Sequence, residues 1–213
     1  MIYKNIKDFL RKRAIELVGL TLISTALLLS ICFFSYSPSD PTLIYGAKNI
    51  VINNLLGIYG GLIADFLLQS FGLAAFLILI IFSIWGISLI FKKKIKNIQF
   101  KIFYLILNLI FTCIFIYATF NNSFWLIDNG NSGFVGQILY KWISIFLPGI
   151  NNQYAIFVLI TLSLFFFILA SNINLNYFLN IFYMFKKNKI LVTESEYLEE
   201  QPEDLVKNNH SLL

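Results

Sequence analysis

Residues 71–91 read FGLAAFLILIIFSIWGISLIF, a run that holds no charged side chain. An α-helix rises about 1.5 Å per residue, so this run is long enough to cross the roughly 30 Å hydrocarbon core of a bilayer. Three further apolar blocks, at residues 14–34, 102–120 and 154–170, have the same property. The sequence therefore predicts an all-α integral membrane protein with four transmembrane helices in contact with the lipid bilayer.

The composition agrees with this class and excludes several kinds of chemistry. Hydrophobic residues make up 58% of the chain and charged residues 13%, about half the charged share of a typical soluble domain. The one histidine, His210, lies close to the C-terminus, which argues against a histidine base or ligand. Cys32 and Cys113 lie inside apolar blocks and are expected to be buried thiols. The sequence offers no catalytic, metal-binding or cofactor-binding motif, so none of these sites is predicted.

The positions of the basic residues predict the orientation of the spans. Of the 16 Lys and Arg residues, 14 lie in the N-terminal stretch, in the link between the second and third spans, or after the fourth span. The two remaining loops carry only Lys48 and Lys141. Because basic residues collect on the cytoplasmic side, both termini are expected in the cytoplasm and both long loops in the periplasm. A cleaved signal peptide is the competing interpretation, but Ser35-Tyr36-Ser37 is a poor cleavage site.

The same features divide the chain into four parts. A basic cytoplasmic N-terminus covers residues 1–13, and the four-span membrane domain covers residues 14–172. An aromatic and basic segment at residues 173–192 is expected at the membrane interface, and the acidic stretch at residues 193–213 is expected to be disordered. The net charge of +5 sits at the ends of the spans rather than in a groove, so direct binding of nucleic acid by this chain is not expected.

Each periplasmic loop contains a stretch with the spacing of an amphipathic helix. The first has an apolar stripe, with Asn54, Gly57, Gly61 and Asp65 on the opposite face. This stripe consists of Ile52, Leu55, Leu56, Tyr59, Leu62, Ile63 and Phe66. The second loop has a similar apolar stripe, which consists of Val135, Ile138, Leu139, Trp142 and Phe146. Two roles are open: packing and anchoring at the outer leaflet, or contact with another copy or a partner. The two halves share this plan, but no residue-level repeat is evident.

A proline-rich turn follows the first span. Residues Ser35-Tyr36-Ser37-Pro38-Ser39-Asp40-Pro41 combine two prolines, which fix φ, with Ser and Asp side chains that favour turns.

This turn and the segments after it resemble the N-terminal four-span (4TM) membrane domain of FtsK-type bacterial DNA translocases. That family places Pro-Ser-Asp-Pro directly after its first span. Its pattern Asn-x-x-Gly-x-x-Gly-(Gly/Ala)-x-x-Ala-Asp before the second span is matched by Asn54, Gly57, Gly60, Gly61, Ala64 and Asp65. Its Gly-Gly-x-x-Gly of the second outward loop is matched by Ser132-Gly133-Phe134-Val135-Gly136, with Ser in place of the first Gly. The resemblance covers about residues 14–172.

The resemblance implies a membrane anchor that oligomerises a DNA translocase and meets other membrane proteins at the division septum, in cell division and chromosome segregation. Family members continue into an ATP-driven motor, but this chain has no Walker A motif, so it is expected neither to bind nucleotide nor to hydrolyse it. It is then either a fragment of a translocase or a membrane domain made on its own. The candidate structural and interaction residues are Pro38, Asp40, Pro41, Asn54, Gly57, Gly61, Asp65, Gly133 and Gly136.

The alternative function is a small four-span transporter or channel subunit. It depends on polar groups inside the spans, and the candidates are Glu16 and Asn108. Each has a simpler expected role: Glu16 pairs with neighbouring basic residues, and Asn108 hydrogen-bonds an adjacent helix.

Overall fold

A computed structural model of the chain describes residues 2–41, 51–92, 94–122, 125–126, 128–150 and 152–171. The chain divides into two units, Met1–Asn172 and Ile173–Leu213, and all the described residues belong to the first. The expectations for residues 173–192 and 193–213, and for His210, therefore lie outside the described residues.

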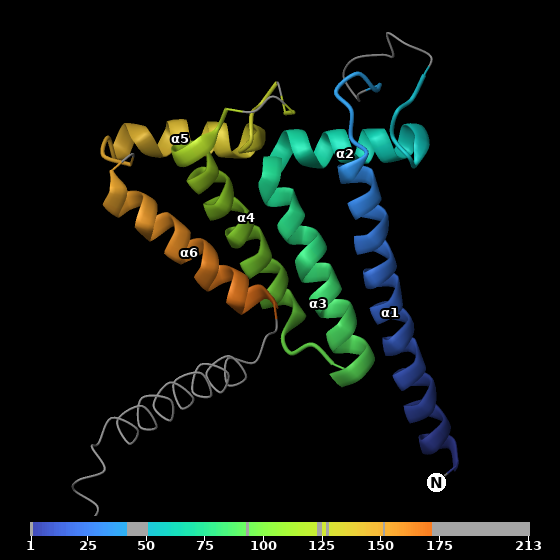
Figure 1. The fold of residues 1–213 in the computed structure, drawn as a ribbon. Coiled ribbons are helices and arrows are strands. Elements are labelled where there is room, and N and C mark those ends of the chain that lie inside the picture. Colours follow the sequence, from blue (N-terminus) through green and yellow to red (C-terminus); the bar gives the residue numbers. More distant parts are fainter. Residues whose placement is uncertain are drawn as a thin grey trace, which may run out of the picture. The chain divides into compact units, whose positions relative to one another are not determined.

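All the regular elements among the described residues are helices, and Figure 1 shows their order. Four stretches are long and apolar enough to cross a membrane: Ile6–Phe34, Gly57–Phe91, Ile98–Phe120 and Gln153–Ser171. The prediction of an all-α chain with four long apolar helices is confirmed. The helices are α1 (Ile2–Phe34), α2 (Gly57–Phe71), the 3-10 turn η1 (Gly72–Ala75), α3 (Phe76–Lys92), α4 (Ile98–Phe120), α5 (Gly133–Phe146) and α6 (Gln153–Ser171).

Three helix starts differ by more than one residue from the predicted starts of the spans, and one of them is α4, which begins at Ile98 rather than at residue 102. Helix α1 begins at Ile2 rather than at residue 14, because the basic N-terminal residues are good helix formers and no Pro or Gly interrupts them. In this helix Arg13 donates a hydrogen bond of 2.6 Å to Glu16, which confirms the expected charge pairing. Helix α3 begins at Phe76 rather than at residue 71, because Gly72 adopts φ 57° and ends α2.

The long helices pack in two pairs, α1 with α3 and α4 with α6. The first pair crosses at two glycines that the sequence had not singled out. A Cβ atom at Gly86 would lie 2.5 Å from Ile23 Cγ1 and 2.7 Å from the carbonyl oxygen of Gly19. The two backbones are therefore in direct contact, which small residues allow and larger ones prevent.

The second pair is joined by polar and aromatic contacts. Asn108 of α4 donates from Nδ2 to the backbone oxygen of Ser163 in α6 at 2.8 Å, which confirms the expected bond to a neighbouring helix. Thr112 and Ser163 share a hydrogen bond of 2.7 Å between their hydroxyls. One turn away Phe111 stacks on Phe166 with ring centroids 5.4 Å apart.

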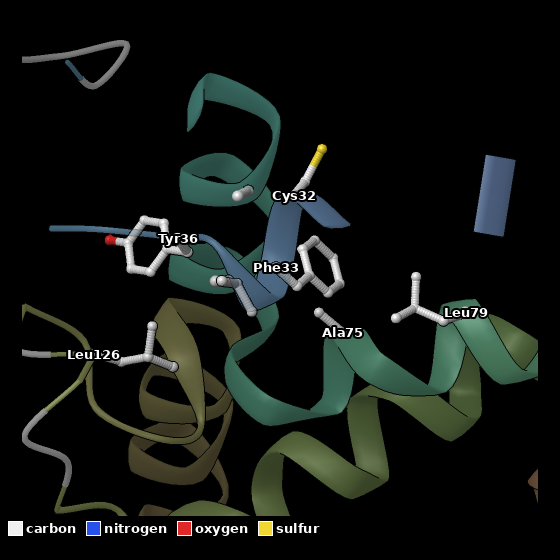
Figure 2. Packing of buried hydrophobic residues seen from close by; sticks show 8 residues of the cluster. Cys32, Phe33, Tyr36, Ala75, Leu79 and Leu126 are labelled. Atoms are coloured by element: carbon white, nitrogen blue, oxygen red, sulfur yellow. The ribbon is translucent and has the colours of Figure 1, made fainter. Parts of the chain in front are cut away.

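The shorter helices α2 and α5 lie across the ends of the long helices, at the end away from the N-terminus (Figure 1). There α2 contacts α1 and α5, and α5 also contacts α4. The core beneath α2 is apolar. Figure 2 shows Phe33, Ala75 and Leu79 packed together, with Tyr36 and Leu126 belonging to the same cluster. This end of the molecule holds most of the candidate residues.

Candidate functional site

The turn after α1 is built by its own sequence. The backbone N–H of Asp40 donates to the carbonyl oxygen of Ser37 at 3.1 Å, which closes a β-turn with Pro38 in its second position. Pro is favoured there because its fixed φ matches the turn. Pro38 is exposed, Pro41 is half-buried, and the Asp40 carboxylate is turned inward, with 5% of the residue exposed.

The Asp40 carboxylate binds the segment that leads into α2. Its Oδ1 accepts hydrogen bonds from the backbone N–H of Asn53 at 2.8 Å and from Asn53 Nδ2 at 3.1 Å. Its Oδ2 accepts from the backbone N–H of Asn54 at 2.9 Å. Bonds to an ionised acceptor are stronger than those between neutral groups. We call Asp40, Asn53 and Asn54 the Asp40 clamp, since together they fix the two ends of the first loop.

Asn54 extends the clamp to α1 and to α2. Its Nδ2 donates to the carbonyl oxygen of Cys32 in the last turn of α1 at 2.9 Å. Its Oδ1 accepts from the backbone N–H of Leu56 at 3.0 Å, an Asx turn that leads into α2. Asn54 is 4% exposed, and it lies before α2 as a buried residue that connects the two helices. The sequence had placed it on the polar face of a helix, and the difference arises because α2 begins three residues later.

Helix α2 presents its small residues inward and its apolar stripe outward. Gly60, Gly61 and Ala64 are buried, whereas Tyr59 and Phe66 of the predicted stripe are exposed. The remaining stripe residues are half-buried or exposed.

Gly57 and Gly61 do not form a matched pair of close-packing positions within the chain. Gly57 has φ +66° and nothing within 4 Å of its would-be Cβ atom, so its role is conformational. A Cβ atom at Gly61 would make ordinary contacts of 3.6 to 3.7 Å with Asp40 and Asn54. The most crowded of the three is Gly60, where a Cβ atom would overlap the Asn54 side chain.

A buried tyrosine connects the first turn to α2 and to the second loop. The Tyr36 hydroxyl donates to Asp65 Oδ1 at 3.1 Å and accepts from Gln69 Nε2 at 3.0 Å. Asn129 of the second loop donates to Gln69 Oε1 at 2.9 Å. The Tyr36 ring meets Trp125 edge to face at 5.6 Å. Burial raises the pKa of Tyr36 to about 12, so its hydroxyl keeps the proton that it donates to Asp65.

The two halves of the domain meet at a second tight contact. The backbone N–H of Leu73 donates to the carbonyl oxygen of Asn131 at 2.8 Å. Gly72 and Gly133 both have positive φ, and a Cβ atom on Gly133 would lie 2.5 Å from the backbone nitrogen of Gly72. We call Gly72, Asn131 and Gly133 the glycine junction. It brings the end of α2 against the start of α5, with Gly136 packed on the backbone of Cys113 in α4.

The structure reveals a local correspondence between the halves that the sequence had not made evident. Helices α2 and α5 each begin at a glycine with φ near +65°, and each has a crowded glycine three positions later, Gly60 and Gly136. In each half an Asn amide donates 2.9 Å to a carbonyl in the last turn of the preceding long helix, Asn54 to Cys32 and Asn131 to Phe120. The shared plan therefore extends to individual hydrogen bonds.

Most of the candidate residues thus lie together at one end of the long helices, where they bond to one another and to neighbouring backbone. The polar groups of the Asp40 clamp bond to one another, and the Tyr36 hydroxyl bonds to Asp65 and Gln69. These bonds fix the two shorter helices. Of the two residues on which a transporter would depend, Glu16 pairs with Arg13, and Asn108 donates from Nδ2 to Ser163 while its buried Oδ1 has no hydrogen-bond partner among the described residues. Asn53, Tyr36, Gln69 and Asn131 were missed as site residues, because isolated polar residues in a loop carry no pattern.

The fold and this site define a class: a helical membrane domain with four long apolar helices and two shorter helices held across one end. The chain matches the family described as the 4TM region of DNA translocase FtsK/SpoIIIE over residues 11–179. The chain therefore belongs to the FtsK/SpoIIIE family of DNA translocases through this membrane region.

Individual relatives agree with the family match. The DNA translocase FtsK of Azospirillum brasilense is 34% identical over 96 residues, which cover 45% of this chain and 15% of the relative. That of Rickettsia bellii is 30% identical over 148 residues, 70% of this chain and 18% of the relative. That of Bradyrhizobium diazoefficiens is 27% identical over 137 residues, 64% of this chain and 16% of the relative. The chain thus spans less than a fifth of each relative. No solved structure matches it.

Proposed function

We propose that this domain anchors an FtsK-type DNA translocase in the bacterial inner membrane, with both ends of the chain in the cytoplasm. The observation that carries the proposal is the family match over residues 11–179, which includes the four long apolar helices. The distribution of Lys and Arg, 14 against two, supports the orientation. In this orientation α2 and α5 lie on the periplasmic side, along the outer leaflet.

The work of such a domain is mechanical and organisational. It tethers the motor of a translocase at the division septum, in cell division and chromosome segregation. It also contacts other septal membrane proteins. The motor belongs to the part of the relatives that this chain does not match. The Asp40 clamp and the glycine junction support this role, because they hold the periplasmic helices in a fixed arrangement against which partners can bind.

A fluorescent protein fused to the C-terminus tests both the orientation and the location. We expect fluorescence, because the fused protein matures in the cytoplasm, and we expect it to gather at midcell in dividing bacteria. The matched control carries the fusion after the first span alone, which places it in the periplasm and leaves it dark. A dark C-terminal fusion would overturn the orientation, and uniform membrane fluorescence would overturn septal location by this domain.

We also propose that the domain forms a homo-oligomer and that the exposed side of α2 is its interface. The small-residue face of α2 is filled by Asp40 and Asn54 of the same chain, so a second copy meets the exposed side instead. Tyr59, at 77% exposed, lies on that side in the first turn of α2.

Cysteine cross-linking tests this contact, since the native Cys32 and Cys113 are buried. We expect Tyr59→Cys to give a disulfide-linked dimer in membranes under mild oxidation. Lys141→Cys, exposed on α5, is the matched control and is expected to stay monomeric. Equal cross-linking at both positions would indicate random collision, and none at Tyr59→Cys would exclude this face.

A further inference from the structure

A hollow of about 440 Å³ opens between the start of α4 and the end of α6. This end of the helices lies opposite α2 and α5 (Figure 1). No part of the site described above reaches it. Its lining consists of Lys96, Asn97, Phe100, Lys101, Tyr104 and Leu169.

Two of the residues that line the hollow are lysines. Lys96 is exposed, and Lys101 is half-buried one turn into α4. Within the part of the chain that the structure describes, neither lysine pairs with a carboxylate. Lys101 Nζ donates to the carbonyl oxygen of Leu169 at 2.5 Å, which holds its ammonium group beside the hollow. An ammonium group has three donors, so this bond leaves Lys101 able to bind an anion as well.

Three further lining residues, Phe100, Tyr104 and Leu169, are apolar or aromatic. Phe100 is 59% exposed although it lies in a helix that is apolar enough to span a membrane. The Tyr104 ring stacks on Phe166 of α6 with centroids 6.2 Å apart, which fixes the ring. Among the described residues its hydroxyl has no hydrogen-bond partner. A ligand that matches both the lysines and the apolar residues of this lining must combine an anion with a hydrocarbon part.

We propose that this hollow binds the phosphate headgroup of an anionic phospholipid. The ammonium groups of Lys96 and Lys101 and the hydroxyl of Tyr104 face the phosphate, and Phe100 and Leu169 contact the glycerol and the first acyl carbons. Basic pockets between transmembrane helices bind such headgroups. A soluble phosphate would bind the lysines but would make no apolar contact with Phe100 and Leu169. The site does not depend on the translocase assignment, and the proposed orientation puts it in the cytoplasmic leaflet.

Native mass spectrometry of the purified full chain in detergent tests the site, with phosphatidylglycerol as the probe and phosphatidylethanolamine as the neutral comparison. We expect phosphatidylglycerol to bind more tightly, and Lys96→Gln to weaken it about fivefold. Lys96 is exposed and has no described partner, so this variant is expected to fold like the parent. Lys141→Gln removes the same charge from α5 and is expected to leave binding unchanged.

Two further measurements distinguish the phosphate of a lipid headgroup from a soluble phosphate ion. Tyr104→Phe removes only a hydroxyl, and we expect it to weaken phosphatidylglycerol by a smaller factor than Lys96→Gln. Inorganic phosphate at millimolar concentration is expected not to displace the lipid. Displacement by phosphate would overturn the lipid assignment in favour of a soluble phosphate ligand. Equal binding of phosphatidylglycerol by the parent and by Lys96→Gln would overturn the site itself.

Discussion

Replacement of Gly133 by alanine is expected to lower the free energy of unfolding by about 3 kcal/mol. Two costs add at this position. The backbone has φ +65°, a conformation that costs an L-residue about 1–2 kcal/mol. The new Cβ atom would also lie 2.5 Å from the backbone nitrogen of Gly72 and 2.6 Å from the carbonyl oxygen of Ser70, and overpacking costs about 1–3 kcal/mol. Equilibrium unfolding in mixed micelles, followed by tryptophan fluorescence, measures the change.

Two other glycines separate these costs. Gly57 has nearly the same φ, +66°, with open space around it, so Gly57→Ala is expected to cost only about 1 kcal/mol. Gly149 has neither a positive φ nor a close neighbour, so Gly149→Ala is expected to be neutral or slightly stabilising. If Gly133→Ala and Gly57→Ala lost the same stability, the glycine junction would not be a tight contact.

The long helices were predictable because their signal is local and strong. Runs such as residues 71–91 are apolar over about 20 residues and are followed by polar residues, and their predicted C-terminal ends lie within one residue of the helix ends at Phe34, Lys92, Phe120 and Ser171. The partner of Glu16 was also predictable, since Arg13 lies one turn away on the same helix. Neither inference required knowledge of which helices pack together.

The site was predictable only as a set of unusual residues. The sequence pointed to Asp40 and Asn54 but could not show that they bond to each other, because 13 residues separate them and the loop between carries no pairing signal. Gly57 and Gly61 were grouped by their spacing. In the structure only Gly57 of the two has a positive φ, and only Gly61 has close neighbours. Both properties depend on where the chain turns before α2. The crossing of Gly19 and Gly86 depends on the pairing of α1 with α3, which no local pattern contains.

Replacement of Asp40 by alanine is expected to be about as damaging as the change at Gly133, with a loss of about 3 kcal/mol. It removes the acceptor of three N–H groups, from the backbone of Asn53 and Asn54 and from Asn53 Nδ2. A buried donor left without a partner costs about 1–3 kcal/mol, and the Asn54 amide is the most deeply buried of the three. The same unfolding measurement applies.

The variants Asp40→Asn and Ser39→Ala show whether acceptor chemistry is the cause. Asparagine keeps the shape of Asp40, but its NH₂ group faces an N–H donor, so we expect an intermediate loss of about 1–2 kcal/mol. Ser39 is exposed, and its hydroxyl accepts from Asn53 Nδ2 at 3.1 Å in a bond that water can replace, so Ser39→Ala is expected to change stability by less than about 0.5 kcal/mol. Hydrogen exchange adds a local reading: the amides of Asn53 and Asn54 should exchange faster in Asp40→Ala, while those of α4 should not. If the clamp holds the segment before α2, its loss should release this segment before the rest of the domain unfolds. A loss of stability without faster exchange at the amides of Asn53 and Asn54 would therefore show that Asp40 stabilises another part of the molecule.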